Sequence, residues 1–272
     1  MNTVELQKIA QQVRISIIKM LGAAGTGHPG GSLSMVEILT VLYFEKMNIR
    51  IDNPKWEERD RFILSKGHGA PGLYAILAER GYFPKEKLGT LRKFKSILQG
   101  HPDMKSTPGL DMSTGSLGQG ISAANGMLLA GKLNNKNYRV YVIVGDGEIQ
   151  EGQIWEAAMS AAHYKLDGLT VFIDANGLQL DGINEEIMGV QPIGEKFAAF
   201  GWHVLEIDGH NMAEISGAVD QAHRVKGKPT VIVANTVKGK GVSFMENQVD
   251  WHGVAPNQEQ VALAIVELER SL

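Results

Sequence analysis

Two polar turns, each following a short apolar run, constrain the fold of this chain more than any other feature. The run 138–144 leads into Gly145-Asp146-Gly147, and the run 169–173 leads into the segment that ends at Asn176. A helix-like segment between them completes a strand–helix–strand crossover, a unit of about 30 or more residues. Strands in such a crossover run parallel, and their carboxyl ends share one edge of the sheet. We therefore expect Asp146 and Asn176 to lie side by side at that edge, where open α/β sheets bind ligands.

One carboxylate and one amide carbonyl among glycines suit a hard divalent cation. Mg²⁺ usually takes one or two carboxylates, and substrate phosphates and water complete its coordination. The alternative is an ordinary crossover with polar turns, because Gly-Asp-Gly alone is common turn material. The strand context, the spacing and the final Asn176 favour the metal and phosphate site. These ligand types do not decide between Mg²⁺, Ca²⁺ and Mn²⁺.

The rest of the chain predicts an α/β fold. Further strands are expected at 61–64, 203–207 and 230–235, and helices at 3–21, 34–46, 73–79, 117–133, 151–165, 194–200, 212–226 and 257–269. Nearly continuous apolar runs are typical of strands buried on both faces, so we expect a parallel sheet with helices on both faces. Ser34 is expected to cap the second helix, with Glu37 as its capping-box partner. No break in composition divides the chain, which predicts a single domain over 1–272.

Composition excludes several classes of function. A net charge of −3 gives no electrostatic reason to expect a nucleic acid or an anionic membrane as partner. The absence of cysteine excludes disulfides, thiolate metal sites and cysteine nucleophiles. No stretch approaches the roughly 18 consecutive apolar residues of a membrane span. The N-terminal sequence lacks the order of a signal peptide, so a cytoplasmic location is expected.

Four of the eight histidines are flanked by glycine in predicted loops: His28, His68, His101 and His252. An imidazole can bond sugar hydroxyls, contact phosphate or move protons near neutral pH. A zinc site is a rival interpretation, but none of these histidines has the short His-x₃₋₅-His spacing of such sites. We expect the other four, His163, His203, His210 and His223, to be structural.

The motifs TGHPGG, LSKGHG, GHP, TGSLGQG, GDG…N and KGKGVSF…WHG occur in the order seen in transketolases. The chain resembles the N-terminal thiamine-diphosphate-binding (PP) domain of a transketolase and, more narrowly, the N-terminal subunit of a split transketolase. The resemblance implies reversible transfer of a two-carbon unit from a ketose or ketose phosphate to an aldose or aldose phosphate, as in the pentose phosphate pathway. Thiamine diphosphate and a divalent ion, Mg²⁺ by default, are the implied cofactors.

The resemblance also assigns roles to residues. Asp146, Asn176 and the carbonyl of Leu178 would bind the metal. The residues expected to bind the cofactor are His68, Gly115, Ser116, Leu117, Gly145, Asp146, Gly147, Glu148, Asn176, Leu178, Lys238 and His252. His28, His68, His101 and His252 would line the ketose channel as the catalytic histidines, with His28 and His252 as candidates for proton transfer.

Four positions add detail to the resemblance. Most transketolases have proline where this chain has Ser116, and Glu151 matches a glutamate of the dimer interface. Lys238 and Lys240 would either approach a phosphate or be solvated loop lysines.

Parts of the family's active site are missing from the motifs of this chain. Transketolases use a glutamate and a stacking aromatic residue from a pyrimidine-binding domain, and they have a further C-terminal domain. The resemblance therefore implies that the partner is a C-terminal subunit, in a heterotetramer of two subunits of each kind. We expect the chain alone to be inactive.

Three alternatives stay open. The first is a subunit of another thiamine-diphosphate enzyme, such as a 2-oxo acid dehydrogenase α-subunit or a deoxyxylulose-phosphate synthase. The second is a Rossmann oxidoreductase, which would need G-x-G-x-x-G between a strand and its helix. The third is a catalytically inactive domain that only binds partners.

Overall fold

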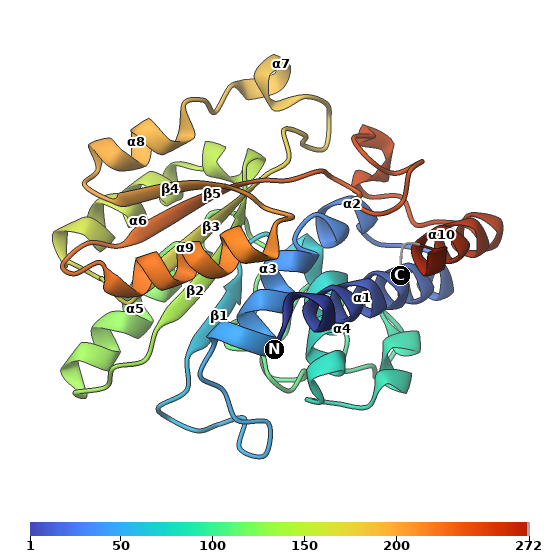
Figure 1. Cartoon of the computed structure of the whole chain (residues 1–272), viewed down its shortest axis with the longest axis horizontal. Helices are drawn as coiled ribbons and strands as arrows, with labels where there is room; N and C mark the ends of the chain where they lie inside the picture. The colour runs from blue at the N-terminus through green and yellow to red at the C-terminus, as the bar shows by residue number, and fades with distance from the viewer. Residues whose placement is uncertain (271–272) are drawn as a thin grey trace.

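The computed structural model describes residues 1–270 and is built on one five-stranded parallel sheet. Its strands are β1 (Arg61–Leu64), β2 (Val140–Gly145), β3 (Leu169–Ala175), β4 (His203–Asp208) and β5 (Thr230–Asn235). Their order across the sheet is β1-β2-β3-β5-β4, and every neighbouring pair is parallel. Helices cover both faces of the sheet (Figure 1), which confirms the predicted fold class.

Side chains of the central strands alternate between two apolar clusters, as the period of two in a strand requires. Tyr141 and Ile143 of β2 point into one cluster, whereas Val140, Val142 and Val144 point into the other. The first cluster is completed by α1 (Thr3–Ala24), α3 (Val36–Val41), α4 (Ala70–Arg80), α9 (Met212–Arg224) and α10 (Gln258–Arg270). The second is completed by α5 (Gly120–Leu133), α6 (Gly152–His163) and α8 (Ile193–Ala199).

Short helical turns lie in the connections. They are α2 (Pro29–Leu33), α7 (Asn184–Met188), the π-helical turn η1 (Leu42–Lys46), and the 3₁₀ turns η2 (Gly67–Gly69), η3 (Lys85–Thr90), η4 (Gly147–Gln150) and η5 (Val249–His252). Several of these turns carry the residues of the predicted site. Within residues 1–270, no helix is both long and apolar enough to cross a membrane.

The predicted helix over 34–46 is wrong at its start. A separate short helix, α2, begins at Pro29, because proline suits the first helical position, and the helix of the predicted segment begins only at Val36. Ser34 is therefore not the N-cap of that helix; it is the C-cap residue of α2, and its hydroxyl donates to a carboxylate oxygen of Asp174 at 2.5 Å. Glu37 is likewise no capping partner, because its carboxylate is buried against Arg14. Contacts between distant segments have replaced the local cap.

The predicted helix over 117–133 begins later than expected, at Gly120. Gly118 has φ of +82°, a left-handed conformation that an α-helix does not contain. Leu117 is thereby left in the loop before the helix, where its side chain can face a ligand.

Candidate functional site

The carboxyl ends of β2 and β3 bring Asp146 and Asn176 to one edge of the sheet, as their spacing predicts. Gly145 pairs in register with Asp174, so the next residues of the two strands leave the sheet together. The carboxylate of Asp146 accepts the backbone N–H of Gly147 at 2.8 Å and that of Gly177 at 2.6 Å. This carboxylate therefore joins the two strand ends.

The amide of Asn176 has a defined orientation. Its Nδ2 donates to Asp174 at 3.3 Å, and its Oδ1 accepts the backbone N–H of Leu178 at 3.2 Å. A carbonyl oxygen has two lone pairs, so Oδ1 keeps one for a further donor or a metal ion.

Asp174 and Lys66 form a fully buried ion pair beneath the site, and neither residue was predicted as functional. The ammonium of Lys66 bonds the carboxylate of Asp174 and the carbonyl oxygen of Gly31, the latter at 2.7 Å. Burial acts to raise the pKa of Asp174, but the charge and hydrogen bond of Lys66 outweigh it and lower that pKa. Lys66 and Asp174 lie just after β1 and at the end of β3, so the strand-end signal that identified Asp146 could have found both.

A cavity of about 250 Å³ opens above these strand ends. Ten of the predicted site residues line it, namely His68, Leu117, Gly145, Asp146, Gly147, Glu148, Asn176, Leu178, Lys238 and His252. Its wall also includes Gln150 and Gln179, whose side chains bond each other at 2.7 Å and which no sequence pattern identified. His28, His101, Gly115 and Ser116 are not part of this wall.

Lys238 lines the cavity beside Leu178 and His252, and only 2% of it is exposed. Its ammonium donates to the carbonyl oxygen of Leu178 at 3.1 Å and to Nδ1 of His252 at 2.8 Å. Burial and then the charge of Lys66 lower the pKa of Lys238 to about 8. Lys240, by contrast, faces away and pairs with Glu246 at 3.3 Å, so the two lysines have different environments.

Three of the four glycine-flanked histidines form one cluster. The ring centroids of His28, His68 and His252 lie 5.1 to 5.6 Å apart. Burial is the main cause that lowers the pKa of His28 to about 4 and that of His252 to about 3, and it holds the pKa of His68 well below its usual value. All three rings are therefore neutral at neutral pH.

His101 is exposed and lies apart from this cluster, against the loop that contains Gly115. A Cβ on Gly115 would lie 3.1 Å from Cγ of His101, and Gly115 has φ of +143°. Ser116 is exposed next to it. His101 and the Gly115-Ser116 loop thus lie together outside the wall of this cavity.

Glu148 connects three segments of the chain through its carboxylate. Its buried carboxylate accepts hydrogen bonds from Ser65 at 2.5 Å, from the N–H of Gly118 at 2.9 Å and from the N–H of Gly145 at 3.1 Å. These contacts connect the end of β2 to the loop before α5. Glu151 is exposed at the rim of the cavity.

The donor set fits a divalent ion held together with phosphate. Burial and the nearby charge of Asp174 raise the pKa of Asp146, so a cation at this carboxylate would relieve unfavourable negative charge. Among the described residues, no group of three or more His, Cys, Asp or Glu side chains is arranged for a metal. A metal here would depend on the amide of Asn176, the carbonyl of Leu178 and oxygens of its ligand.

Buried Asn184 gives a second indication of a polar ligand. Its side chain lies beside the carboxylate of Asp146 and acts to lower the pKa of that group, whereas its Oδ1 has no hydrogen-bond donor within the described part of the chain. This Oδ1 would lie 3.6 Å from a Cβ on Gly147, which lines the cavity. Unpaired buried polar groups of this kind are costly and are typically satisfied by a ligand, ion or water.

Residues 5–268 match the family model for the transketolase thiamine diphosphate binding domain. The chain is 51% identical over 267 residues to the 6-deoxy-6-sulfo-D-fructose transketolase subunit SqwG of Clostridium sp., a match that covers 98% of this chain and 97% of that subunit. It is 41% identical to an apulose-4-phosphate transketolase subunit of Phocaeicola vulgatus, covering 99% and 95% of the two chains.

Solved transketolases share the fold. The enzyme of Campylobacter jejuni superposes with a TM-score of 0.92 at 31% identity, covering 99% of this chain and 43% of that one. The enzyme of Leishmania mexicana gives a TM-score of 0.91 at 31% identity, covering 97% and 41%. This chain thus spans about two fifths of the solved transketolases but nearly the whole of the two subunits above. The chain belongs to the transketolase family, as its thiamine diphosphate binding domain.

Proposed function

We propose that this chain is the N-terminal subunit of a two-chain transketolase, which moves a two-carbon unit reversibly from a ketose to an aldose. The observation that carries the proposal is the set of Asp146, Asn176 and Leu178 oxygens at the strand ends, facing a cavity lined by neutral histidines. Its domain organisation is proposed to be a single PP domain, with the pyrimidine-binding and C-terminal domains on the partner.

The cavity residues have distinct proposed roles. Asp146, Asn176 and the carbonyl of Leu178 would hold Mg²⁺. Lys238 and His68 would contact the diphosphate, and Gly115, Ser116 and Leu117 would flank the rings. Bound thiamine diphosphate would supply the electron-accepting ring system that cleavage of the carbon–carbon bond requires.

The histidines would act on the sugar hydroxyls. Because Nδ1 of His252 accepts a hydrogen bond from Lys238, its ring proton lies on Nε2, which can donate to a sugar oxygen. Nδ1 of His28 is buried and has no hydrogen-bond partner among the described residues. The lowered pKa values keep these rings neutral near neutral pH, so each can both donate and accept a hydrogen bond with the sugar hydroxyls. His68, in the wall of the cavity, and His101, outside it, would bind the sugar by further hydrogen bonds.

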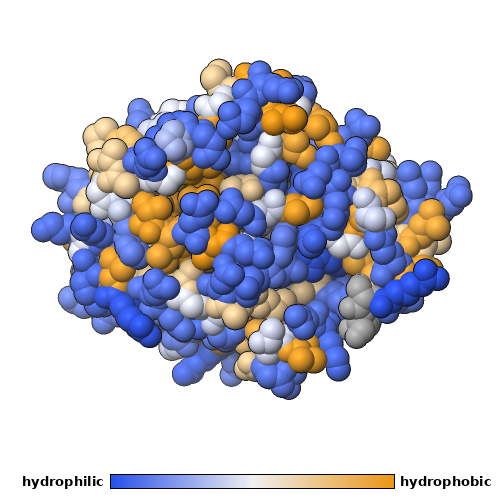
Figure 2. All heavy atoms as spheres, turned by 45° about the horizontal axis from the view of Figure 1, so that its top comes forward, coloured by the Kyte–Doolittle hydropathy of each residue, from blue (hydrophilic) through white to orange (hydrophobic). Residues whose placement is uncertain are grey.

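An apolar rim supports docking of a partner beside the cavity. Leu180 lines the cavity and is 62% exposed, and Ile183, Ile187 and Met188 in and before α7 are also exposed. Figure 2 shows apolar atoms among polar ones on the side of the molecule that carries α7. Exposed apolar groups next to an open site are typical of an interface. A heterotetramer with two C-terminal subunits would cover this rim.

The two relatives indicate the class of sugar. One is named for a sulfonated ketose and the other for a ketose phosphate, so both names describe sugars with a strongly anionic end group. We propose such a sugar, phosphorylated or sulfonated, as the substrate of this chain's assembly. A role in the pentose phosphate pathway and a cytoplasmic location remain predictions.

Calorimetric titration tests the proposal. Thiamine diphosphate with Mg²⁺ would be titrated into this chain alone and into its mixture with a C-terminal transketolase subunit. We expect tight binding and two-carbon transfer only in the mixture, and loss of both in Asp146→Ala. Transfer by the chain alone would contradict the two-chain proposal, and binding without turnover in the mixture would favour an inactive domain.

A further inference from the structure

Lys238 lies in a segment, 236–248, that forms neither an α-helix nor a strand. Its ammonium must nevertheless reach the carbonyl of Leu178 and the ring of His252 at the bottom of the cavity. One backbone contact holds the segment to α2, because the N–H of Gly239 donates to the carbonyl of Gly30 at 3.1 Å. The position of the ammonium therefore depends on what fixes the backbone around Lys238.

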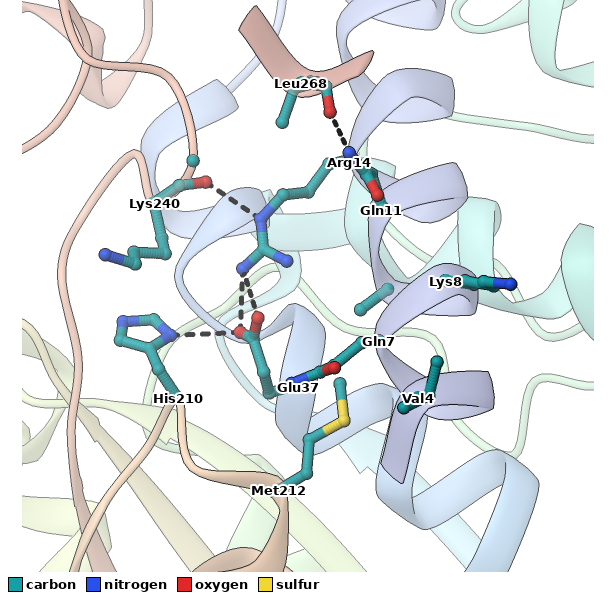
Figure 3. Close-up of a pocket in the computed structure, with 12 residues that line it drawn as sticks. Val4, Gln7, Lys8, Gln11, Arg14, Glu37, His210, Met212, Lys240 and Leu268 are labelled. Carbon is teal, nitrogen blue, oxygen red and sulfur yellow. Dashed lines mark hydrogen bonds and ion pairs between the residues drawn. The ribbon is translucent and has the colours of Figure 1, made fainter. Parts of the chain in front are cut away.

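Two side chains from other elements hold this backbone on either side of Lys238. Nε2 of His210, in the turn between β4 and α9, accepts the N–H of Val237 at 2.8 Å. Nε of Arg14, on α1, donates to the carbonyl of Lys240 at 3.0 Å (Figure 3). Residues 237 and 240 are thus each anchored to a side chain.

Glu37 connects these two side chains to each other. Its two carboxylate oxygens accept from Nη2 of Arg14 at 2.7 and 2.8 Å, and one of them also contacts Nδ1 of His210 at 3.0 Å (Figure 3). Burial alone would raise the pKa of Glu37, but Arg14 and the hydrogen bond of His210 lower it to about 2. The carboxylate is therefore ionised at neutral pH and keeps both partners in place.

The contacts of His210 assign its tautomer. Nε2 accepts a backbone N–H and must be unprotonated, so the ring proton lies on Nδ1 and is donated to Glu37. His210 was expected to be merely structural, yet its two nitrogens join a buried carboxylate to the residue before Lys238. Arg14, Glu37 and His210 line an open pocket of about 400 Å³, which shares no lining residue with the proposed cofactor cavity.

We propose that Glu37, Arg14 and His210 are positioning residues that fix the backbone of segment 237–240 and so place the Lys238 ammonium at the diphosphate end of the cavity. The inference rests on the proposed function only for the identity of the ligand that Lys238 contacts. None of the three residues lines the cavity itself. Their effect on binding passes through the backbone of Val237 and Lys240.

Two substitutions of His210 separate its two hydrogen bonds. The amide of Gln in His210→Gln reaches the position of Nε2 and can still accept the N–H of Val237. The amide of Asn in His210→Asn reaches the position of Nδ1 and keeps only the bond to Glu37. Each variant loses one hydrogen bond, so a purely structural role predicts similar losses of thermal stability and of function.

The experiment measures the dissociation constant of thiamine diphosphate in excess Mg²⁺, with the chain assembled with its C-terminal subunit. Lys238→Met is the reference variant, and we expect it to weaken binding about tenfold or more, since it removes a hydrogen bond to a charged group. His210→Asn is expected to weaken binding about threefold to tenfold, whereas His210→Gln stays near the unsubstituted chain. Saturating cofactor should restore kcat in His210→Asn.

The outcomes distinguish the proposals. Equal losses in His210→Asn and His210→Gln, or a loss of kcat that cofactor does not restore, would overturn positioning through Val237. Weak binding in Lys238→Met with normal binding in His210→Asn would overturn the positioning role and leave the proposed function intact. Normal binding in Lys238→Met would show that Lys238 does not contact the cofactor. It would then contradict both the proposed diphosphate contact of Lys238 and its positioning by Glu37, Arg14 and His210.

Discussion

Gly177 donates its backbone N–H to Oδ2 of Asp146 at 2.6 Å and so ties the turn after β3 to the turn after β2. The other carboxylate oxygen accepts the N–H of Gly147 at 2.8 Å. Each oxygen therefore has one backbone donor and keeps lone-pair capacity for a metal. The carboxylate is held in place by the backbone before any ligand arrives, which is the preorganisation that binding sites require.

Asp146→Asn should abolish metal-dependent cofactor binding without unfolding the chain. Substitution of residues that only orient metal ligands typically costs 10- to 100-fold in affinity, so loss of a direct ligand should cost about 100-fold or more. Asn is nearly the same size and removes a negative charge that burial and Asp174 disfavour. Its NH2 would, however, face one of the two backbone N–H groups that Asp146 accepts, so we expect a modestly lower melting temperature of a folded chain together with lost binding in calorimetry.

Asp181→Asn is the matched control for that experiment, because Asp181 is exposed in the loop that follows the site. It should bind thiamine diphosphate and Mg²⁺ as the unsubstituted chain does. Normal Mg²⁺-dependent binding in Asp146→Asn would remove Asp146 from the metal site.

Gly30→Ala should impair cofactor binding, whereas Gly31→Ala should have little effect. A Cβ on Gly30 would lie 2.9 Å from Cγ of Lys238 and 2.9 Å from the carbonyl oxygen of Trp251, so both segments would have to move. On Gly31 the nearest atoms would be 3.6 Å away, an ordinary contact. We expect Gly30→Ala to cost about 1–3 kcal/mol in unfolding free energy, as overpacking does, and to weaken cofactor affinity in the same titration. Equal behaviour of the two variants would argue against tight packing at the lysine.

Acidification from pH 6.5 to 4.5 should destabilise the cofactor-free chain. Burial lowers the pKa of His28 to about 4 and that of His252 to about 3, so in this range the unfolded chain binds protons that the folded chain does not. Stability then falls as pH falls. In urea unfolding, the unfolding free energy of the double variant His28→Gln/His252→Gln should depend less steeply on pH than that of the unsubstituted chain. His163→Gln, an exposed control, should keep the original pH dependence. The same pH dependence in the unsubstituted chain, the double variant and His163→Gln would show that the rings of His28 and His252 do not cause the loss of stability.

The sequence predicted the strand ends because their signal is local. An apolar run followed by glycine and a polar side chain identified Asp146 and Asn176, and a parallel crossover sufficed to place them together. Glycine neighbours likewise identified His28, His68 and His252, which the structure gathers into one cluster.

Contacts between distant segments could not be predicted in this way. Ser34 matches a helix cap in sequence, but in the fold it bonds Asp174, 140 positions away. The bonds of Glu37 to Arg14 and His210 depend on the packing of α1 and of the turn before α9 against α3, which periodicity does not specify. His101 has the same glycine context as the other three histidines, yet the course of its loop leaves it exposed and against Gly115, outside the wall of the cavity.

The buried pair of Lys66 and Asp174 gives the last prediction. Lys66→Met should destabilise the chain by about 3–5 kcal/mol, since it leaves Asp174 charged and fully buried without its cation. The double variant Lys66→Met/Asp174→Asn removes that charge and should recover part of the loss, which urea unfolding of Lys66→Met, Asp174→Asn and the double variant would measure. Additive losses would show that the two charges do not compensate each other. Because Asp174 also orients the amide of Asn176, the double variant should regain stability but not Mg²⁺-dependent cofactor affinity.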